Sequence, residues 1–206
     1  SQPYNIKYVE IGNELYGGWQ IGFTDAKGNA ERYAQFYKVL RPGNEKINFI
    51  ATGFDREWNR KLVELNGKDI RSISVHTLIG NGIPATANPR EVYEEVIAHS
   101  DGYTEDLYDL ARPMIDAGLF PQLAITELQI YTNIHTLPNN WNLSEAVWFA
   151  GIIHSCIRTQ GIVELITHSA LVNHAGGLRK DLIVYPNPVW WTTFLYSTQP
   201  GVIPVE

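Results

Sequence analysis

The chain has little cysteine, little charge and no long apolar run, and each shortage excludes a class of protein. One of its 206 residues is cysteine, Cys156, which excludes an intrachain disulfide and a cysteine-based zinc site. No run approaches about eighteen consecutive apolar residues, the length typical of a membrane-spanning helix. Only 18% of the residues are charged and the formal net charge is −6, without the basic surface typical of nucleic-acid binding. We therefore expect neither a membrane nor a nucleic acid as partner.

Apolar and aromatic residues, in contrast, are abundant. They make up 44% and 12% of the chain, a composition that excludes a disordered protein, and a chain of this size can bury most of its apolar surface. The chain begins with Ser1 and shows no signal peptide, which we interpret as a processed or cut chain whose true N-terminus is missing. Composition alone leaves the cellular compartment open.

Short apolar runs alternate with helical patterns along the whole chain. The runs, rich in Ile and Val, fit buried parallel strands and lie at Ile6–Ile11, Ile47–Ala51, Ile70–Val75, Gln122–Leu128 and Ile162–Ile166. Helices are predicted over Ala30–Leu40, from a cap at Asp55 to a stop at Gly67, over Pro89–His99 and Glu105–Ala117, from a cap at Ser144, and over Pro188–Tyr196. This alternation predicts an α/β fold with a parallel sheet.

Two architectures fit five such strand–helix units: an open doubly wound sheet, or part of a barrel. A complete eight-unit barrel typically needs about 250 residues, more than are present here. No G-x-G-x-x-G or G-x-x-x-x-G-K-[ST] motif follows any of the strands, so a nucleotide-binding sheet lacks motif support.

Polar side chains gather where the predicted strands end. Asn13 and Glu14 follow the first strand, His76 ends the third, Glu127 ends the fourth, and the fifth leads into the His168 region. Active sites of parallel α/β folds lie at the carboxyl ends of the strands. We therefore expect two carboxylates, an amide and several imidazoles at one rim.

Glu14 and Glu127, 113 positions apart (127 minus 14), form a candidate catalytic pair. Glycoside hydrolysis needs one protonated carboxyl to donate to the leaving oxygen and one ionised carboxylate to attack or to activate water. Asn13 could fix a sugar hydroxyl. Each Glu could instead cap a helix or pair with a basic residue, although the apolar neighbours of Glu127 make an unpaired carboxylate costly there.

Other interpretations of these residues remain possible. His76 could orient a carboxylate, bind substrate, or be a satisfied polar residue at a strand end. A metal-dependent hydrolase could use His76, His168 and Glu127, but no H-E-x-x-H spacing supports it, and Ser169 lies in no G-x-S-x-G elbow. Four tryptophans could stack on sugars or simply pack in the core: Trp19, Trp141, Trp190 and Trp191.

Several segments resemble one family of enzymes, in the same order. Tyr4–Leu15 (YNIKYVEIGNEL) resembles the acid/base strand of family 51 glycoside hydrolases, the α-L-arabinofuranosidases. Asn-Glu at the end of barrel strand four is the signature of the retaining (β/α)8 glycosidase clan, and Ala124–Leu128 (AITEL) resembles its strand seven. Further similar segments are Ser72–His76 (SISVH), Ser169–Asn173 (SALVN) and Trp190–Ser197 (WWTTFLYS). The resemblance covers nearly the whole chain.

The resemblance implies a (β/α)8 TIM barrel of which residues 1–206 form one partial domain, supplying roughly strands 4 to 8 with their helices. It implies Glu14 as general acid/base, Glu127 as nucleophile, Asn13 on the sugar 2-hydroxyl, His76 beside the nucleophile and Asn173 near the glycone. No metal or organic cofactor is implied.

This chain also departs from the family pattern. It has Thr77-Leu78 where the family often has a Tyr, and Leu128-Gln129 where the family often has an aromatic residue. These departures concern the substrate more than the reaction.

The function implied is the retaining, double-displacement removal of α-L-arabinofuranosyl groups from plant polysaccharides, as in arabinan degradation. The partners implied are an arabinose-containing oligo- or polysaccharide and the rest of the barrel, supplied by another chain or a missing segment. The resemblance favours an extracellular or periplasmic location, although some relatives act in the cytoplasm on imported oligosaccharides. The alternatives are an endoglucanase or xylan-directed enzyme of the same clan, and a non-catalytic carbohydrate-binding fragment.

Overall fold

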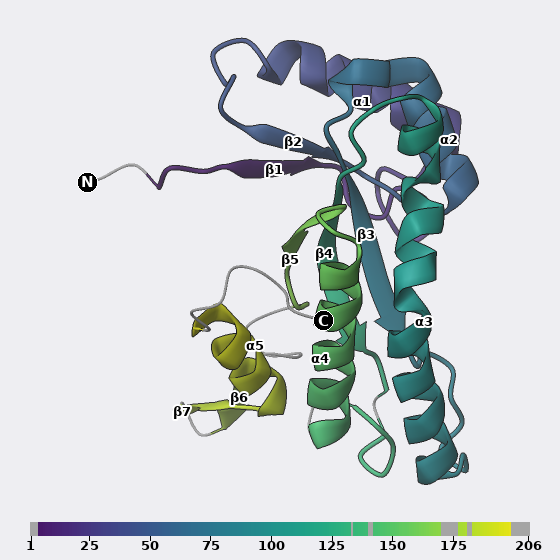
Figure 1. Cartoon of the computed structure of the whole chain (residues 1–206), viewed down its shortest axis with the longest axis vertical. Coiled ribbons are helices and arrows are strands. Elements are labelled where there is room, and N and C mark those ends of the chain that lie inside the picture. Colours follow the sequence, from purple (N-terminus) through teal and green to yellow (C-terminus); the bar gives the residue numbers. More distant parts are fainter. Residues whose placement is uncertain (1–3, 133, 140–141, 170–176, 181–182, 199–206) are drawn as a thin grey trace. The chain divides into compact units, whose positions relative to one another are not determined.

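The fold is that of a computed structural model, which describes residues 4–132, 134–139, 142–169, 177–180 and 183–198 (Figure 1). Its elements in chain order are β1 (Tyr8–Ile11), α1 (Ala26–Leu40), β2 (Asn48–Ala51), α2 (Arg56–Asn66), η1 (Gly67–Asp69), β3 (Ser72–Ile79), α3 (Pro89–Asp116), β4 (Leu123–Ile130), α4 (Leu143–Arg158), β5 (Val163–Ile166), β6 (Gly177–Lys180), β7 (Ile183–Pro186) and α5 (Pro188–Thr198). None of the helices in these ranges is both long and apolar enough to cross a membrane.

The first five strands form one sheet in the order β1-β2-β3-β4-β5, so every strand neighbours the next one along the chain. β1 pairs parallel with β2, which pairs parallel with β3. The predicted α/β fold with a parallel sheet is therefore confirmed. A doubly wound sheet reverses its strand order at a switch point, whereas a (β/α) barrel adds strands in sequence, so the order observed is that of a barrel.

All five predicted strands are present, but two of them continue further than the sequence indicated. β3 runs on to Ile79 and β4 to Ile130, so His76 and Glu127 lie within strands rather than at their ends. The backbone of Tyr131 donates to the carbonyl of Ile79 (2.6 Å), which keeps the two extensions side by side. Pairing with the neighbouring strands determines where a strand ends, and the local composition of the strand gives no information about that pairing.

The structure differs from the prediction in three further places, two in helices and one in a hairpin. α3 is one continuous helix where two were predicted, because buried contacts offset the cost of Gly102: Tyr103 is buried and the carbonyl of Ser100 accepts from Ser155 Oγ (2.7 Å). The cap of α4 is Asn142 rather than Ser144; its side chain accepts from the Ser144 amide. The antiparallel hairpin β6–β7 was not predicted.

The chain divides into two compact units. Unit 1 comprises residues 1–76, 107–125 and 162–165, and holds β1, β2, α1 and α2. Within it α1 packs against α2, which begins at the predicted cap Asp55, whose carboxylate accepts from the Trp58 amide (2.8 Å). Every residue of β2 is buried, as expected for a strand covered on both faces.

Unit 2 comprises residues 77–106, 126–161 and 166–206 and holds α4, which packs against α5. A buried polar pair lies in its interior. Glu145 Oε1 accepts from the Ile130 amide (2.9 Å) and lies 3.0 Å from His168 Nε2. Glu145 Oε2 and His168 Nδ1 are buried and have no hydrogen-bond partner among the described residues. The pair joins the end of β4, the first turn of α4 and the segment after β5.

Burial raises the pKa of Glu145, while the hydrogen bond and charge of His168 and the amide of Ile130 oppose that rise. A folded-state pKa above the unfolded value gives a stabilising contribution that is complete below the unfolded pKa. That contribution is lost as pH rises through the folded pKa.

We therefore expect Glu145→Gln to be about as stable as the parent protein near pH 5 and more stable at pH 8. The amide oxygen can accept both hydrogen bonds without a buried charge. Glu145→Ala should cost about 3 kcal/mol, because His168 and the Ile130 amide lose their acceptor. Urea unfolding of the full-length protein at both pH values measures this, and Glu91→Gln in the exposed first turn of α3 is the matched control. Equal stability of the Ala and Gln variants would contradict the assignment.

Candidate active site

Glu14 lies in a tight turn directly after β1, in unit 1. Its φ of 47° is in the left-handed region, which side chains other than Gly rarely adopt, at a typical cost of about 1–3 kcal/mol. Gly12 (φ 95°) makes the preceding bend, where an added Cβ would lie 2.6 Å from Thr52 Oγ1. Thr52 Oγ1 in turn donates to the carbonyl of Ile11 (2.9 Å). Thr52, the residue directly after β2, thus holds the end of β1 in the geometry that positions Glu14.

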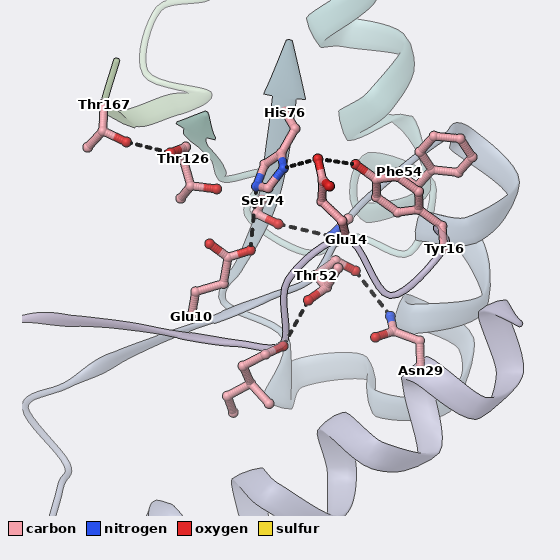
Figure 2. Close-up of polar contacts among 12 residues, drawn as sticks. Glu10, Glu14, Tyr16, Asn29, Thr52, Phe54, Ser74, His76, Thr126 and Thr167 are labelled. Atoms are coloured by element: carbon pink, nitrogen blue, oxygen red, sulfur yellow. Dashed lines mark hydrogen bonds and ion pairs between the residues drawn. The ribbon is translucent and has the colours of Figure 1, made fainter. Parts of the chain in front are cut away.

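Three side chains contact the carboxylate of Glu14, and Figure 2 shows two of them, His76 and Tyr16. His76 Nδ1 lies 2.9 Å from Oε1, the Tyr16 hydroxyl donates to the same oxygen (3.2 Å), and the Trp19 indole donates to Oε2 (3.0 Å). Partial burial by itself would raise the pKa of Glu14. The hydrogen bonds from His76 and Trp19, with the charge of His76 and the Tyr16 hydroxyl, outweigh burial and hold that pKa below its usual range.

Aromatic rings support this carboxylate from one side. Tyr16 stacks on Phe54, with centroids 4.0 Å apart, and meets Trp58 edge to face. Trp58 is fixed in turn by its indole, which donates to the carbonyl of Thr52 (2.9 Å). Trp19 is 72% exposed, so its ring offers surface to solvent while its N–H binds Glu14. The sequence had singled out Trp19 as a possible stacking residue; Tyr16 and Phe54 carried no comparable signal.

Glu10 is a further carboxylate of this cluster that the sequence reasoning missed. It lies on β1, and its Oε1 is 4.0 Å from His76 Nε2. The signal was present, since an acidic residue within a run that predicts a buried strand is costly unless it is paired or used. The proximity of Glu10 to His76, 66 positions along the chain (76 minus 10), could not be read from the sequence.

Glu127 lies in unit 2, half-buried on β4, and the backbone on either side of it is held by the segment after β5. Thr167 Oγ1 donates to the carbonyl of Thr126 (2.7 Å), a contact drawn in Figure 2, and the Ser169 amide donates to the carbonyl of Leu128 (3.0 Å). These bonds fix the strand segment from which the Glu127 side chain projects.

The remaining candidates are distributed as follows. Asn13 is exposed beside Glu14, and Asn173 lies outside the described residues. His168, considered above as a metal ligand, contacts the buried carboxylate of Glu145. Trp190 and Trp191 meet edge to face on α5, with Trp190 stacked on Phe194. Trp141 is not among the described residues.

No model of a known protein family matches the chain, but individual known proteins are similar to it. A probable α-L-arabinofuranosidase C of Aspergillus clavatus is 25% identical over 224 aligned positions, which cover 95% of this chain and 43% of that protein. An intracellular exo-α-(1→5)-L-arabinofuranosidase of Bacillus subtilis is 33% identical over 87 positions, 39% of this chain and 17% of that protein. The chain thus spans less than half of the length of these relatives.

Solved structures show the same fold. The α-L-arabinofuranosidase of Thermotoga maritima, in complex with arabinose, matches with a TM-score of 0.76 and 23% identity, over 93% of this chain and 39% of that one. The family 51 α-L-arabinofuranosidase of Thermotoga petrophila matches with a TM-score of 0.71 and 24% identity, over 96% and 41%. The chain is therefore similar, over nearly its whole length, to a portion of the family 51 α-L-arabinofuranosidases, and its fold is that of the corresponding part of their catalytic barrel.

Proposed function

We propose that this chain carries the two catalytic carboxylates of a retaining glycoside hydrolase that removes α-L-arabinofuranosyl groups from plant polysaccharides. The observation that carries the proposal is the carboxylate of Glu14. A strained turn holds it at the end of a parallel strand, and His76, Tyr16 and Trp19 surround it, in a chain similar to arabinofuranosidases.

In this proposal Glu127 attacks the anomeric carbon while protonated Glu14 donates its proton to the leaving oxygen. Glu14, now ionised, then takes a proton from the water that hydrolyses the glycosyl-enzyme. No metal or organic cofactor is required.

The contacts of Glu14 favour the second half of this cycle. Hydrogen bonds from His76 and Trp19 stabilise the carboxylate, which is the form that activates water. For the first half the carboxyl must hold a proton, and a second negative charge on Glu127 would promote that until the glycosyl bond neutralises it. Asn13 on the sugar 2-hydroxyl and Asn173 near the glycone complete the proposed site.

We further propose that the N-terminal barrel strands, supplied by another chain or by a missing segment, complete the domain of which residues 1–206 form roughly strands 4 to 8. β1 is the outermost strand of the sheet, with one pairing edge left over among the described residues. Beside it, a cavity of about 390 Å³ is lined by apolar residues of β1 and α1, among them Ile11, Tyr33 and Phe36. Phe36 is 55% exposed, and covering it would remove apolar surface from water.

The first prediction concerns the nucleophile. Incubation of the full-length protein with a 2-deoxy-2-fluoro arabinofuranosyl inactivator should add one sugar to the peptide that holds Glu127, because the fluorine slows hydrolysis of the glycosyl-enzyme more than its formation. Intact mass and peptide mapping measure this. Glu127→Gln should gain no adduct. An adduct on another carboxylate, or none on a folded and complete protein, would refute the role of Glu127.

The second prediction concerns Glu14. Glu14→Gln should slow hydrolysis of an unactivated arabino-oligosaccharide by about 10²–10⁴-fold, the usual contribution of a general acid. It should affect formation of the glycosyl-enzyme from a nitrophenyl arabinofuranoside much less, since that leaving group departs without a proton. Steady-state and burst kinetics measure both. The exposed Glu31 of α1 gives the control Glu31→Gln, and an equal loss on both substrates would contradict the acid role.

The third prediction concerns completion of the barrel. Residues 1–206 expressed alone should associate or unfold without cooperativity, because their apolar edge stays uncovered. Size-exclusion chromatography with light scattering and urea unfolding measure this. A compact monomer with one cooperative transition would contradict the proposal.

A further inference from the structure

Two carboxylates of unit 1 face the two ring nitrogens of one buried histidine (Figure 2). The side chain of His76 is 5% exposed; its Nδ1 lies 2.9 Å from Glu14 Oε1 and its Nε2 lies 4.0 Å from Glu10 Oε1. The proposed catalytic cycle uses Glu14 and leaves Glu10 without a role. A half-buried carboxylate on a strand, next to the histidine that touches the candidate acid/base, calls for an explanation.

The contact with Glu14 determines which ring nitrogen of His76 must carry a hydrogen. An ionised carboxylate only accepts hydrogen bonds, so Nδ1 must carry a hydrogen when Glu14 is ionised. The negative charge of Glu10 lies on the other side of the ring, facing Nε2, and the partly buried surroundings strengthen its field. The contact at 4.0 Å is of ion-pair rather than direct hydrogen-bond length.

We propose that Glu10 is a positioning residue, which holds the His76 ring in the orientation that presents Nδ1–H to Glu14. This inference rests on the proposed function of Glu14 as acid/base. Glu10 touches no reacting atom and keeps its charge throughout. The proton that moves in the reaction goes from Glu14 to the leaving oxygen and returns to Glu14 from water, while His76 keeps its own protons and stabilises the carboxylate formed between the two steps.

The substitution Glu10→Gln tests this, because it removes the charge and keeps the shape. Two mechanisms predict opposite shifts of the pKa of Glu14. If Glu10 acts through His76, its loss frees the ring to turn, the hydrogen bond from Nδ1 to Glu14 weakens, and the pKa of Glu14 rises. If Glu10 acts only as a neighbouring negative charge, its removal lowers the pKa of Glu14. The alkaline limb of kcat/KM reports the pKa of a general acid in the free enzyme.

We expect the alkaline limb of the full-length Glu10→Gln enzyme to move to higher pH, because Glu14 then keeps its proton to higher pH. Glu10→Asp should restore part of the parent profile. The control is Glu164→Gln on β5 in the same unit; Glu164 accepts from Asn48 Nδ2 (2.8 Å) and Gln122 Nε2 (3.5 Å), and its loss should leave the limb in place. A limb that stays in place or moves to lower pH in Glu10→Gln would overturn the positioning role.

A second measurement separates this inference from the proposed function. Carbon-13 NMR of the Glu14 side-chain carboxyl follows its titration without any turnover, and ¹⁵N signals of His76 report which ring nitrogens carry hydrogen. An upward shift of the Glu14 titration in Glu10→Gln, in a protein that hydrolyses no arabinofuranoside, would support the positioning contact and refute the function. Active enzyme with an unchanged Glu14 titration and unchanged His76 signals would refute the positioning contact and leave the function standing.

Discussion

The contact between His76 and the carboxylate of Glu14 is the constraint on which the candidate site of unit 1 depends. It joins the third strand of the sheet to the turn after the first, across 62 positions of sequence. The turn is conformationally costly, since Glu14 is in the left-handed region, and hydrogen bonds from Thr52 and from the aromatic side chains hold it there. These contacts fix the position of the carboxylate and favour its ionised form.

Interior carboxylates recur in this chain, and each has a partner. Glu14 has His76, Glu145 has His168 and the Ile130 amide, and Glu164 has the amides of Asn48 and Gln122. Taking a carboxylate out of water is expensive unless hydrogen bonds replace the solvent, so each such group constrains the elements that supply its donors. In unit 2 that constraint falls on the end of β4 and the segment after β5, on either side of the proposed nucleophile Glu127. Burial of polar pairs thus fixes the segments from which the candidate catalytic groups project.

The similarity to family 51 arabinofuranosidases and the arrangement of these residues support the same proposal from different directions. The comparisons concern the order of strands and helices over most of this chain. The part of each relative that matches is less than half of its length. The contacts of Glu14 concern chemistry: a carboxylate stabilised in its ionised form, beside an exposed indole and an exposed amide. In the proposed complete barrel, the further strands would add at the outer strand β1, beside the apolar cavity.

The sequence by itself determined the alternation of five strands with helices, the cap at Asp55, and the choice of Glu14, His76 and Glu127 as candidate residues. Apolar runs and capping residues are local signals that depend little on the rest of the fold, although at α4 the cap is Asn142 and not the predicted Ser144. Only the tertiary structure decided how far β3 and β4 extend and that α3 is continuous, because strand pairing and buried contacts override weak local breakers. It also decided the partners of the carboxylates. Contacts with neighbours in space give Glu10, Tyr16 and the pair of Glu145 with His168 their roles. Periodicity along one segment carries no information about contacts between segments far apart in the chain.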